Sequence, residues 1–182
     1  MNKLVKLPLF LGICGAACAG VLAGVNAITA PIIEQARIDA ANAAYIETYK
    51  EFNVTSEHIT IEEVEIYAAN CTTRAVIVND AVKGIAYTCS AKGYAGTVSF
   101  QVAFANGQYL GYTDLGNNET SGFGKDLIDK MTSLIKGNDA NEALLNNSNY
   151  ASAIAGQSIT GRAIANAVEA CRTDYLAWYS AQ

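Results

Sequence analysis

The sequence lacks most of the side chains that build a catalytic or metal centre. His58 is the only histidine, and no Cys-x-x-Cys, His-x-x-x-His or phosphate-loop pattern occurs among the 182 residues. These absences argue against the common zinc sites and nucleotide-binding loops. We therefore predict no metal site and no catalytic side chain, and we expect His58 to be solvated in a loop.

Basic side chains are scarce as well. Twelve Lys and Arg stand against seventeen Asp and Glu, and the net charge of −5 becomes −7 once Lys3 and Lys6 are set aside. A chain this acidic offers no basic face to a nucleic acid. With 51% hydrophobic residues it is not a disordered linker, and its length suits one mid-sized domain plus an additional element.

Charge is missing altogether from residues 7–33. About 20 apolar residues suffice for a helix to cross the hydrocarbon core of a bilayer, so this stretch predicts a transmembrane helix. Lys3 and Lys6 precede it, which places the N-terminus in the cytoplasm. We expect a single-pass protein of the cell membrane with an extracytosolic C-terminal domain.

Two alternatives to an uncleaved anchor exist. Ala17-Cys18-Ala19 could end a cleavable signal peptide, and Cys18 could be a lipid-modified cysteine. Cleavage at either point would leave Val21–Ile33 as an exposed apolar tail, which favours the anchor.

Small residues recur every four positions within the anchor, at Gly12, Ala16, Gly20 and Gly24. Such a stripe lets two helices approach closely in lipid. Glycine and alanine are common in membrane spans, but the regular spacing favours a partner subunit in the membrane.

Beyond the anchor, the hydrophobic pattern predicts a helical stalk over residues 32–49, then strands, then helices. Strands are expected at 62–67, 73–78, 82–88, 96–105 and 108–113, the last two joined by a tight turn at Asn106-Gly107. A short helix at 126–136 and a surface loop at 137–149 precede a final helix. The apolar stripe of that helix is Ile164, Val168, Cys171, Tyr175 and Trp178.

This order of elements predicts an α+β fold. We expect one N-terminal transmembrane anchor at residues 1–33, a helical stalk and connector at 34–60, and a single domain at 61–182. That domain should combine an antiparallel sheet with a C-terminal helix.

Two cysteines of this domain fall on neighbouring predicted strands. If the first hairpin turns through the three residues 79–81, Val78 faces Val82 and Cys71 faces Cys89. An extracytosolic location permits a disulfide between Cys71 and Cys89. Two buried free thiols are the alternative.

Two segments that precede helices carry the strongest chemical signal. In residues 118–124, Gly122 and Gly124 allow a flat ligand to approach the backbone, and Thr120 and Ser121 supply hydroxyl groups. Residues 153–164 open the final helix, and Thr160 is expected to be its N-cap.

Together with the anchor end Val25–Pro31 and the pair Gly93-Tyr94, these segments resemble the FMN-binding domain of the G subunit of the Rnf electron-transport complex. The related C subunit of the sodium-translocating NADH:quinone reductase shares these features. The resemblance covers nearly the whole chain. Its flavin-attachment motif, usually Ser-Gly-Ala-Thr followed by a branched residue and Thr, corresponds here to residues 155–160.

The resemblance implies FMN bound covalently to Ser158 through a phosphoester, which a flavin transferase forms. The ring would lie against Glu119–Gly124, and the phosphate would lie near the amides around Thr160. The residues implied in cofactor binding are Ser158, Glu119, Thr120, Ser121, Gly122, Gly124, Gly156, Ile159 and Thr160.

The function implied is that of an electron-transfer subunit of an ion-translocating ferredoxin:NAD oxidoreductase complex. Its partners would be other membrane subunits, and it would have no independent activity. One alternative is a structural subunit of the same complex that has lost the covalent flavin. Another is a binding module unrelated to electron transfer.

Overall fold

The computed structural model describes residues 3–122, 124–156 and 158–182, without the side chains of residues 3–10, 13, 34–41 and 158. The chain divides into two compact units, residues 1–44 and 45–182. Helix α1 (Lys3–Thr48) makes up the described part of the first unit, and its last turn belongs to the second.

Helix α1 contains the predicted apolar segment. Its stretch Cys14–Ile33 is 20 residues long and apolar enough to cross a membrane, which is compatible with a membrane anchor. The helix continues past Pro31 to Thr48, as the composition of residues 32–49 predicts.

The second unit is built on a five-stranded antiparallel sheet in the order β1-β2-β3-β4-β5. The predicted α+β fold with a C-terminal helix is thereby confirmed. The strands are β1 (Ile59–Ile66), β2 (Cys71–Val78), β3 (Lys83–Lys92), β4 (Thr97–Ala105) and β5 (Gln108–Gly116). Short 3-10 turns occupy Lys50–Phe52, Ser56–His58, Tyr67–Ala69 and Leu144–Asn146.

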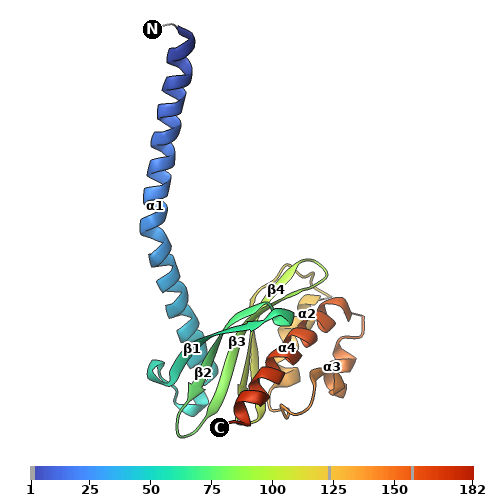
Figure 1. Ribbon diagram of the computed structural model, residues 1–182. Helices are drawn as coiled ribbons and strands as arrows, with labels where there is room; N and C mark the ends of the chain where they lie inside the picture. The colour runs from blue at the N-terminus through green and yellow to red at the C-terminus, as the bar shows by residue number, and fades with distance from the viewer. Residues whose placement is uncertain (1–2, 123, 157) are drawn as a thin grey trace. The chain divides into compact units, whose positions relative to one another are not determined.

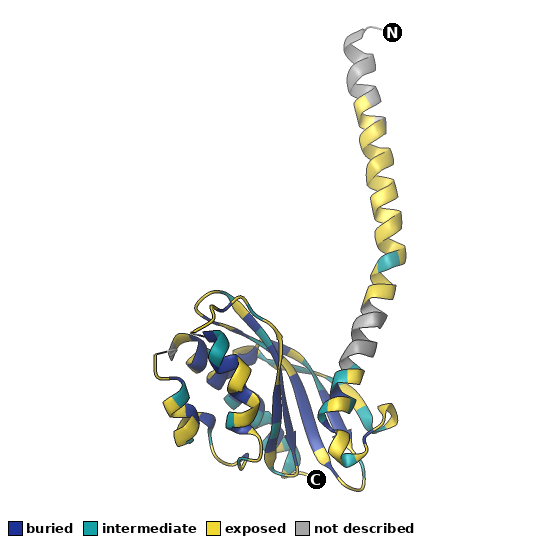
Figure 2. Cartoon of the chain, turned by 180° about the vertical axis from the view of Figure 1, so that it is seen from behind, coloured by how far each residue is buried: buried dark blue, intermediate teal, exposed yellow. Residues whose placement is uncertain are grey.

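Three helices follow the sheet along the chain and gather on one of its faces (Figure 1). They are α2 (Gly124–Ile135), α3 (Ser148–Ala153) and α4 (Ser158–Tyr179). The apolar stripe predicted for the last helix is confirmed in α4, where Ile164, Val168, Cys171 and Tyr175 are completely buried. Buried residues accordingly line the strands and the inner sides of the helices (Figure 2).

The sheet buries both of its faces, because side chains alternate between them along each strand. Ile85 and Tyr87 of β3 face the helices and join the main core. On the opposite face, Tyr49 lies against Gly84, and its hydroxyl donates a hydrogen bond to the carbonyl of Phe104 at 2.7 Å. The residues just after α1 therefore cover the sheet face that the later helices leave open.

The turn predicted at Asn106-Gly107 is confirmed. Asn106 has φ of 49° and Gly107 has φ of 82°, the left-handed pair that a two-residue hairpin turn requires. The Asn106 carboxamide oxygen also accepts a hydrogen bond from the backbone N–H of Lys83.

The register predicted for the first hairpin is wrong by one residue. Val78 pairs with Lys83 rather than with Val82, so the loop contains four residues. Asn79 closes this loop, because its side-chain oxygen accepts hydrogen bonds from the N–H groups of Ala81 and Val82, and its own N–H donates to the Val82 carbonyl.

The shifted register removes the facing pair on which the expected Cys71–Cys89 disulfide depended. Both cysteines are buried free thiols. The Cys89 sulfur instead lies 3.3 Å from the sulfur of Cys171 on α4.

The segment at residues 137–149 is less exposed than the predicted surface loop. Ala140 and Leu144 are buried, and the guanidinium of Arg172 donates hydrogen bonds to the carbonyls of Ala140 and Asn141. The sequence is polar here, but α4 reaches back to hold the backbone against the core.

One charged cluster connects α4 to the sheet. The Arg74 guanidinium donates to Asp174 at 2.5 Å and to Glu62 at 2.9 and 3.0 Å. The Tyr87 hydroxyl donates to the same Asp174 carboxylate at 2.6 Å. Burial, together with the hydrogen bond to Asp174, raises the pKa of Tyr87 well above its usual range, so this phenol stays a neutral donor.

We expect Asp174→Asn to lower the free energy of unfolding by about 1–3 kcal/mol, because Arg74 and Tyr87 lose a shared charged acceptor. Urea unfolding of the full chain in detergent micelles, followed by tyrosine and tryptophan fluorescence, measures the change. Asp80→Asn, at an exposed loop position, is the matched control. Equal stability of the two variants would contradict the role given to Asp174.

Candidate functional site

Three segments that are distant in the sequence meet at the start of α4. The first is the turn at residues 93–96 between β3 and β4, closed by a hydrogen bond from the Gly93 N–H to the Gly96 carbonyl. The second is the loop at residues 117–122 that leads into α2, and the third is the first turn of α4.

Two buried side chains fasten these segments together. The Thr160 hydroxyl accepts a hydrogen bond from the Tyr94 N–H at 3.0 Å, and the Glu119 carboxylate accepts one from the Ala95 N–H at 3.0 Å. Glu119 is 8% exposed and Thr160 is 2% exposed. Both residues were predicted to contact the cofactor, and the structure places both within the scaffold that holds the 93–96 turn.

Glycines on both sides leave room for the Glu119 carboxylate. A Cβ added at Gly93 would collide with one carboxylate oxygen, and a Cβ added at Gly124 would collide with the other. Gly124 was expected to allow close approach of a flat ligand, but the group that lies close to it is the Glu119 side chain. Gly122 has φ of 83°, and its N–H donates to Asp126 in the first turn of α2.

The prediction that Thr160 is the N-cap of the final helix is wrong. Helix α4 already begins at Ser158, so Thr160 lies within its first turn and uses its hydroxyl across the fold. Gly156, with φ of 87°, lies just ahead of the helix. Gln157 of the attachment motif and Phe123 of the second segment lie outside the described residues, as does the side chain of Ser158.

Short helix α3 supports the beginning of α4 from the other side. The Tyr150 hydroxyl donates a hydrogen bond to the Gly161 carbonyl at 2.7 Å, and burial raises the pKa of this phenol, which keeps it protonated. A side chain at position 161 would collide with Ile154. The first turn of α4 is thus held by groups from α3, the 93–96 turn and the segment just after α3.

The remaining predicted residues are exposed around this scaffold. Thr120, Ser121 and Gly122 are exposed in the loop before α2. Ile159 is 58% exposed, and Tyr94, whose backbone bonds to Thr160, is 80% exposed. Two large apolar side chains, those of Ile159 and Tyr94, are therefore exposed on segments that meet at the start of α4.

A cavity of about 620 Å³ lies alongside the same end of α4. Its lining combines apolar side chains with one cation and one carboxamide. The lining residues are Leu145, Ala151, Ile154, Ala155, Gly156, Arg162 and Asn166.

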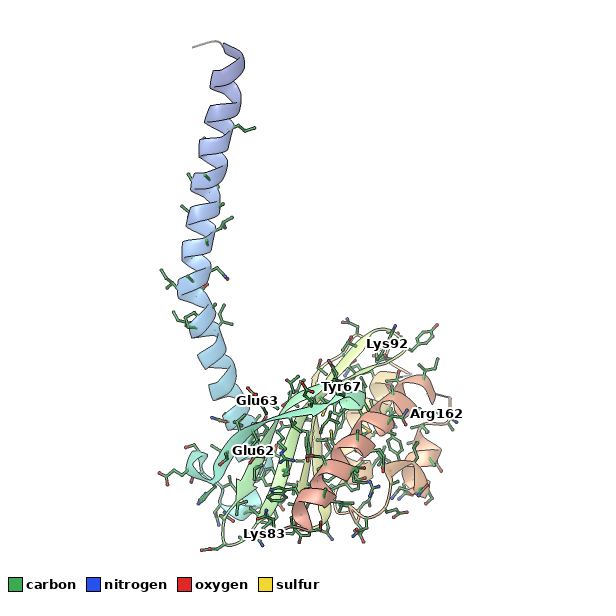
Figure 3. The ribbon with its side chains drawn as sticks, in the orientation of Figure 1. Glu62, Glu63, Tyr67, Lys83, Lys92 and Arg162 are labelled. Carbon is green, nitrogen blue, oxygen red and sulfur yellow. The ribbon has the colours of Figure 1, made fainter. Side chains whose placement is uncertain are left out.

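Sequence reasoning missed Arg162 and Asn166. The signal was available in their spacing, because positions 158, 162 and 166 follow one another at intervals of four and share one face of the helix. Figure 3 shows Arg162 on the N-terminal half of α4.

The described residues contain no group of three His, Cys, Asp or Glu side chains arranged to hold a metal ion. The His58 side chain forms hydrogen bonds within its own turn, since its Nδ1 lies 3.1 Å from both the backbone nitrogen and the hydroxyl of Thr55. Its expected solvation is therefore only partial.

We expect Gly124→Ala to displace the Glu119 carboxylate and to destabilise the fold by about 1–3 kcal/mol, since the added methyl group has no free space. Gly111→Ala is the matched control, because its Cβ would make only an ordinary contact with Thr132 at 3.9 Å. Amide hydrogen exchange at Ala95 provides a local measurement. Slow exchange at Ala95 in Gly124→Ala would contradict this account of Glu119.

Comparison with known proteins gives a family for the segment that contains this site. A search of curated proteins finds no match. Residues 93–173 match the family described as the FMN-binding domain, a segment that runs from the 93–96 turn into α4 and includes every predicted cofactor residue. The match supports the FMN-binding domain family for this part of the chain, and with it FMN as the cofactor and a flavin-based redox role.

Proposed function

We propose that this chain is a membrane-anchored electron-transfer subunit of an Rnf-type ion-translocating complex and carries FMN covalently on Ser158. The observation that supports this most strongly is the family match over residues 93–173. Within that segment, the motif residues converge at the start of α4. FMN supplies reversible electron transfer when bound, and the chain's own residues attach it, orient it and hold it near the membrane.

Ser158 is well placed for a phosphoester. It is the first residue of α4, where unpaired backbone N–H groups and the positive end of the helix dipole favour a negatively charged group. Arg162 lies one turn further on the same face and lines the adjacent cavity. Its guanidinium is suited to pair with phosphate oxygens.

The isoalloxazine ring would lie on the exposed surface beside this attachment point. Tyr94 and Ile159 offer it apolar side chains, and the exposed backbone of Thr120–Gly122 offers polar groups at its rim. Glu119 and Thr160 would act beneath this surface by fixing the 93–96 turn. A covalently held ring needs no deep cleft, because the ester prevents its loss.

Intact-protein mass tests the attachment. Full-length chain coexpressed with a flavin transferase should gain the mass of one FMN less water, and Ser158→Ala should gain nothing, because it lacks the hydroxyl that forms the ester. Ser152→Ala, a nearby exposed serine in α3, should keep the adduct. In-gel flavin fluorescence after denaturation gives a second reading.

An unmodified wild-type mass would favour the alternative of a structural subunit that has lost its covalent flavin. Retention of the adduct by Ser158→Ala, with loss in Thr160→Ala, would move the attachment to Thr160. Thr160→Ala removes the hydroxyl at that position, so it separates attachment at Thr160 from attachment at Ser158.

The anchor would place Lys3 and Lys6 in the cytoplasm and the C-terminal domain outside the cell membrane, where other membrane subunits are its partners. Gly12, Gly20 and Gly24 expose a face of α1 on which an added Cβ would meet no atom of this chain. A neighbouring transmembrane helix could pack closely there. The flavin transferase is a second partner, required only for maturation.

We expect Gly20→Leu to lower the recovery of the assembled complex severalfold, because the larger side chain holds a neighbouring helix away. Gly15→Leu makes the same substitution on a different face of α1, where it also meets no atom of this chain. Affinity purification through a C-terminal tag, with quantification of copurified membrane subunits, measures both. Equal recovery with the two variants would remove the argument for this face.

A further inference from the structure

Three cysteines from different elements meet in the core between α4 and the sheet. Cys71 begins β2, Cys89 lies in β3, and Cys171 lies in α4. Each is at most 3% exposed. The sulfur atoms of Cys89 and Cys171 are 3.3 Å apart.

We propose that Cys89 and Cys171 are a disulfide-forming pair that fastens α4 to the central strand of the sheet, with Cys71 remaining a thiol. Formation of the bond removes one proton and one electron from each thiol. A low-molecular-weight or protein disulfide accepts both electrons and both protons and is reduced to two thiols. The inference does not depend on flavin attachment.

Cys89 and Cys171 are favoured over the other pairings by their contacts. Their two sulfurs, 3.3 Å apart, are already closer than two unbonded sulfur atoms normally pack. The Cys71 thiol is engaged elsewhere, since it donates a hydrogen bond to the carbonyl of Thr73 at 3.1 Å.

The burial of the pair determines when the bond can form. An oxidant cannot reach sulfurs in the closed core, so exchange takes place while α4 is undocked, during folding or in a partly opened state. Once α4 has docked, the same burial protects the bond from reductants. An extracytosolic location, as proposed above, would supply disulfide oxidants.

The link would matter for the candidate site because α4 carries Ser158 at its start. Cys171 lies 13 positions further along the same helix. A covalent link there prevents α4 from leaving the sheet. Opening of the domain would then leave α4, and Ser158 with it, attached to the sheet through β3.

Thiol counting tests the proposal on the full chain in detergent micelles, in a Cys14→Ala, Cys18→Ala background. The protein is incubated with oxidised and reduced glutathione at a urea concentration that populates partly opened molecules, then returned to buffer, denatured and alkylated without reductant. We expect one alkylated thiol, in the peptide that contains Cys71, and a disulfide-linked peptide pair containing Cys89 and Cys171.

Three alkylated thiols, or a linked pair that includes Cys71, would overturn the proposal. Cys71→Ala in the same background should keep the linked pair and leave no free thiol. The wild-type arrangement of these three cysteines is measured directly, so the result stands even if Cys71→Ala does not fold. Reduction of the linked protein should lower its midpoint of urea unfolding, and an unchanged midpoint would contradict the fastening of α4.

Discussion

The burial of one apolar stripe of α4 against the sheet is the interaction on which the rest of residues 45–182 depends. The ring of Tyr175 stacks on Phe104 of β4 with centroids 4.9 Å apart, and its hydroxyl accepts a hydrogen bond from Gly107 in the β4–β5 turn. Because the helix is rigid, this contact near its C-terminal end also fixes its first turn. The position of Ser158 is therefore set by core packing many residues away.

A second constraint acts at the other end of the helix. The Glu119 carboxylate occupies space that only glycine leaves open at positions 93 and 124, and it takes up the backbone N–H of Ala95. The Thr160 hydroxyl likewise accepts a hydrogen bond from the backbone N–H of Tyr94. Two of the predicted cofactor residues, Glu119 and Thr160, therefore hold the loops in place.

This division of roles suits a carrier with an attached cofactor. If FMN is esterified as proposed, the ester holds the flavin without a deep binding cleft. The ring can then remain exposed for electron exchange with neighbouring subunits. A membrane anchor would add to this by raising the effective concentration of those neighbours.

The sequence by itself determined the features that depend on local pattern: the apolar helix, the five antiparallel strands, the Asn106-Gly107 turn and the stripe of α4, since each follows from hydrophobic period or backbone preference. It also pointed to residues 118–124 and 153–164 as the important segments. Tertiary structure decided the rest. The first hairpin's register depends on hydrogen bonds of Asn79, the roles of Glu119 and Thr160 depend on the distant Tyr94 and Ala95, and Cys171 meets Cys89 only because α4 docks on β3. Such contacts join residues far apart in the chain, so no local pattern encodes them.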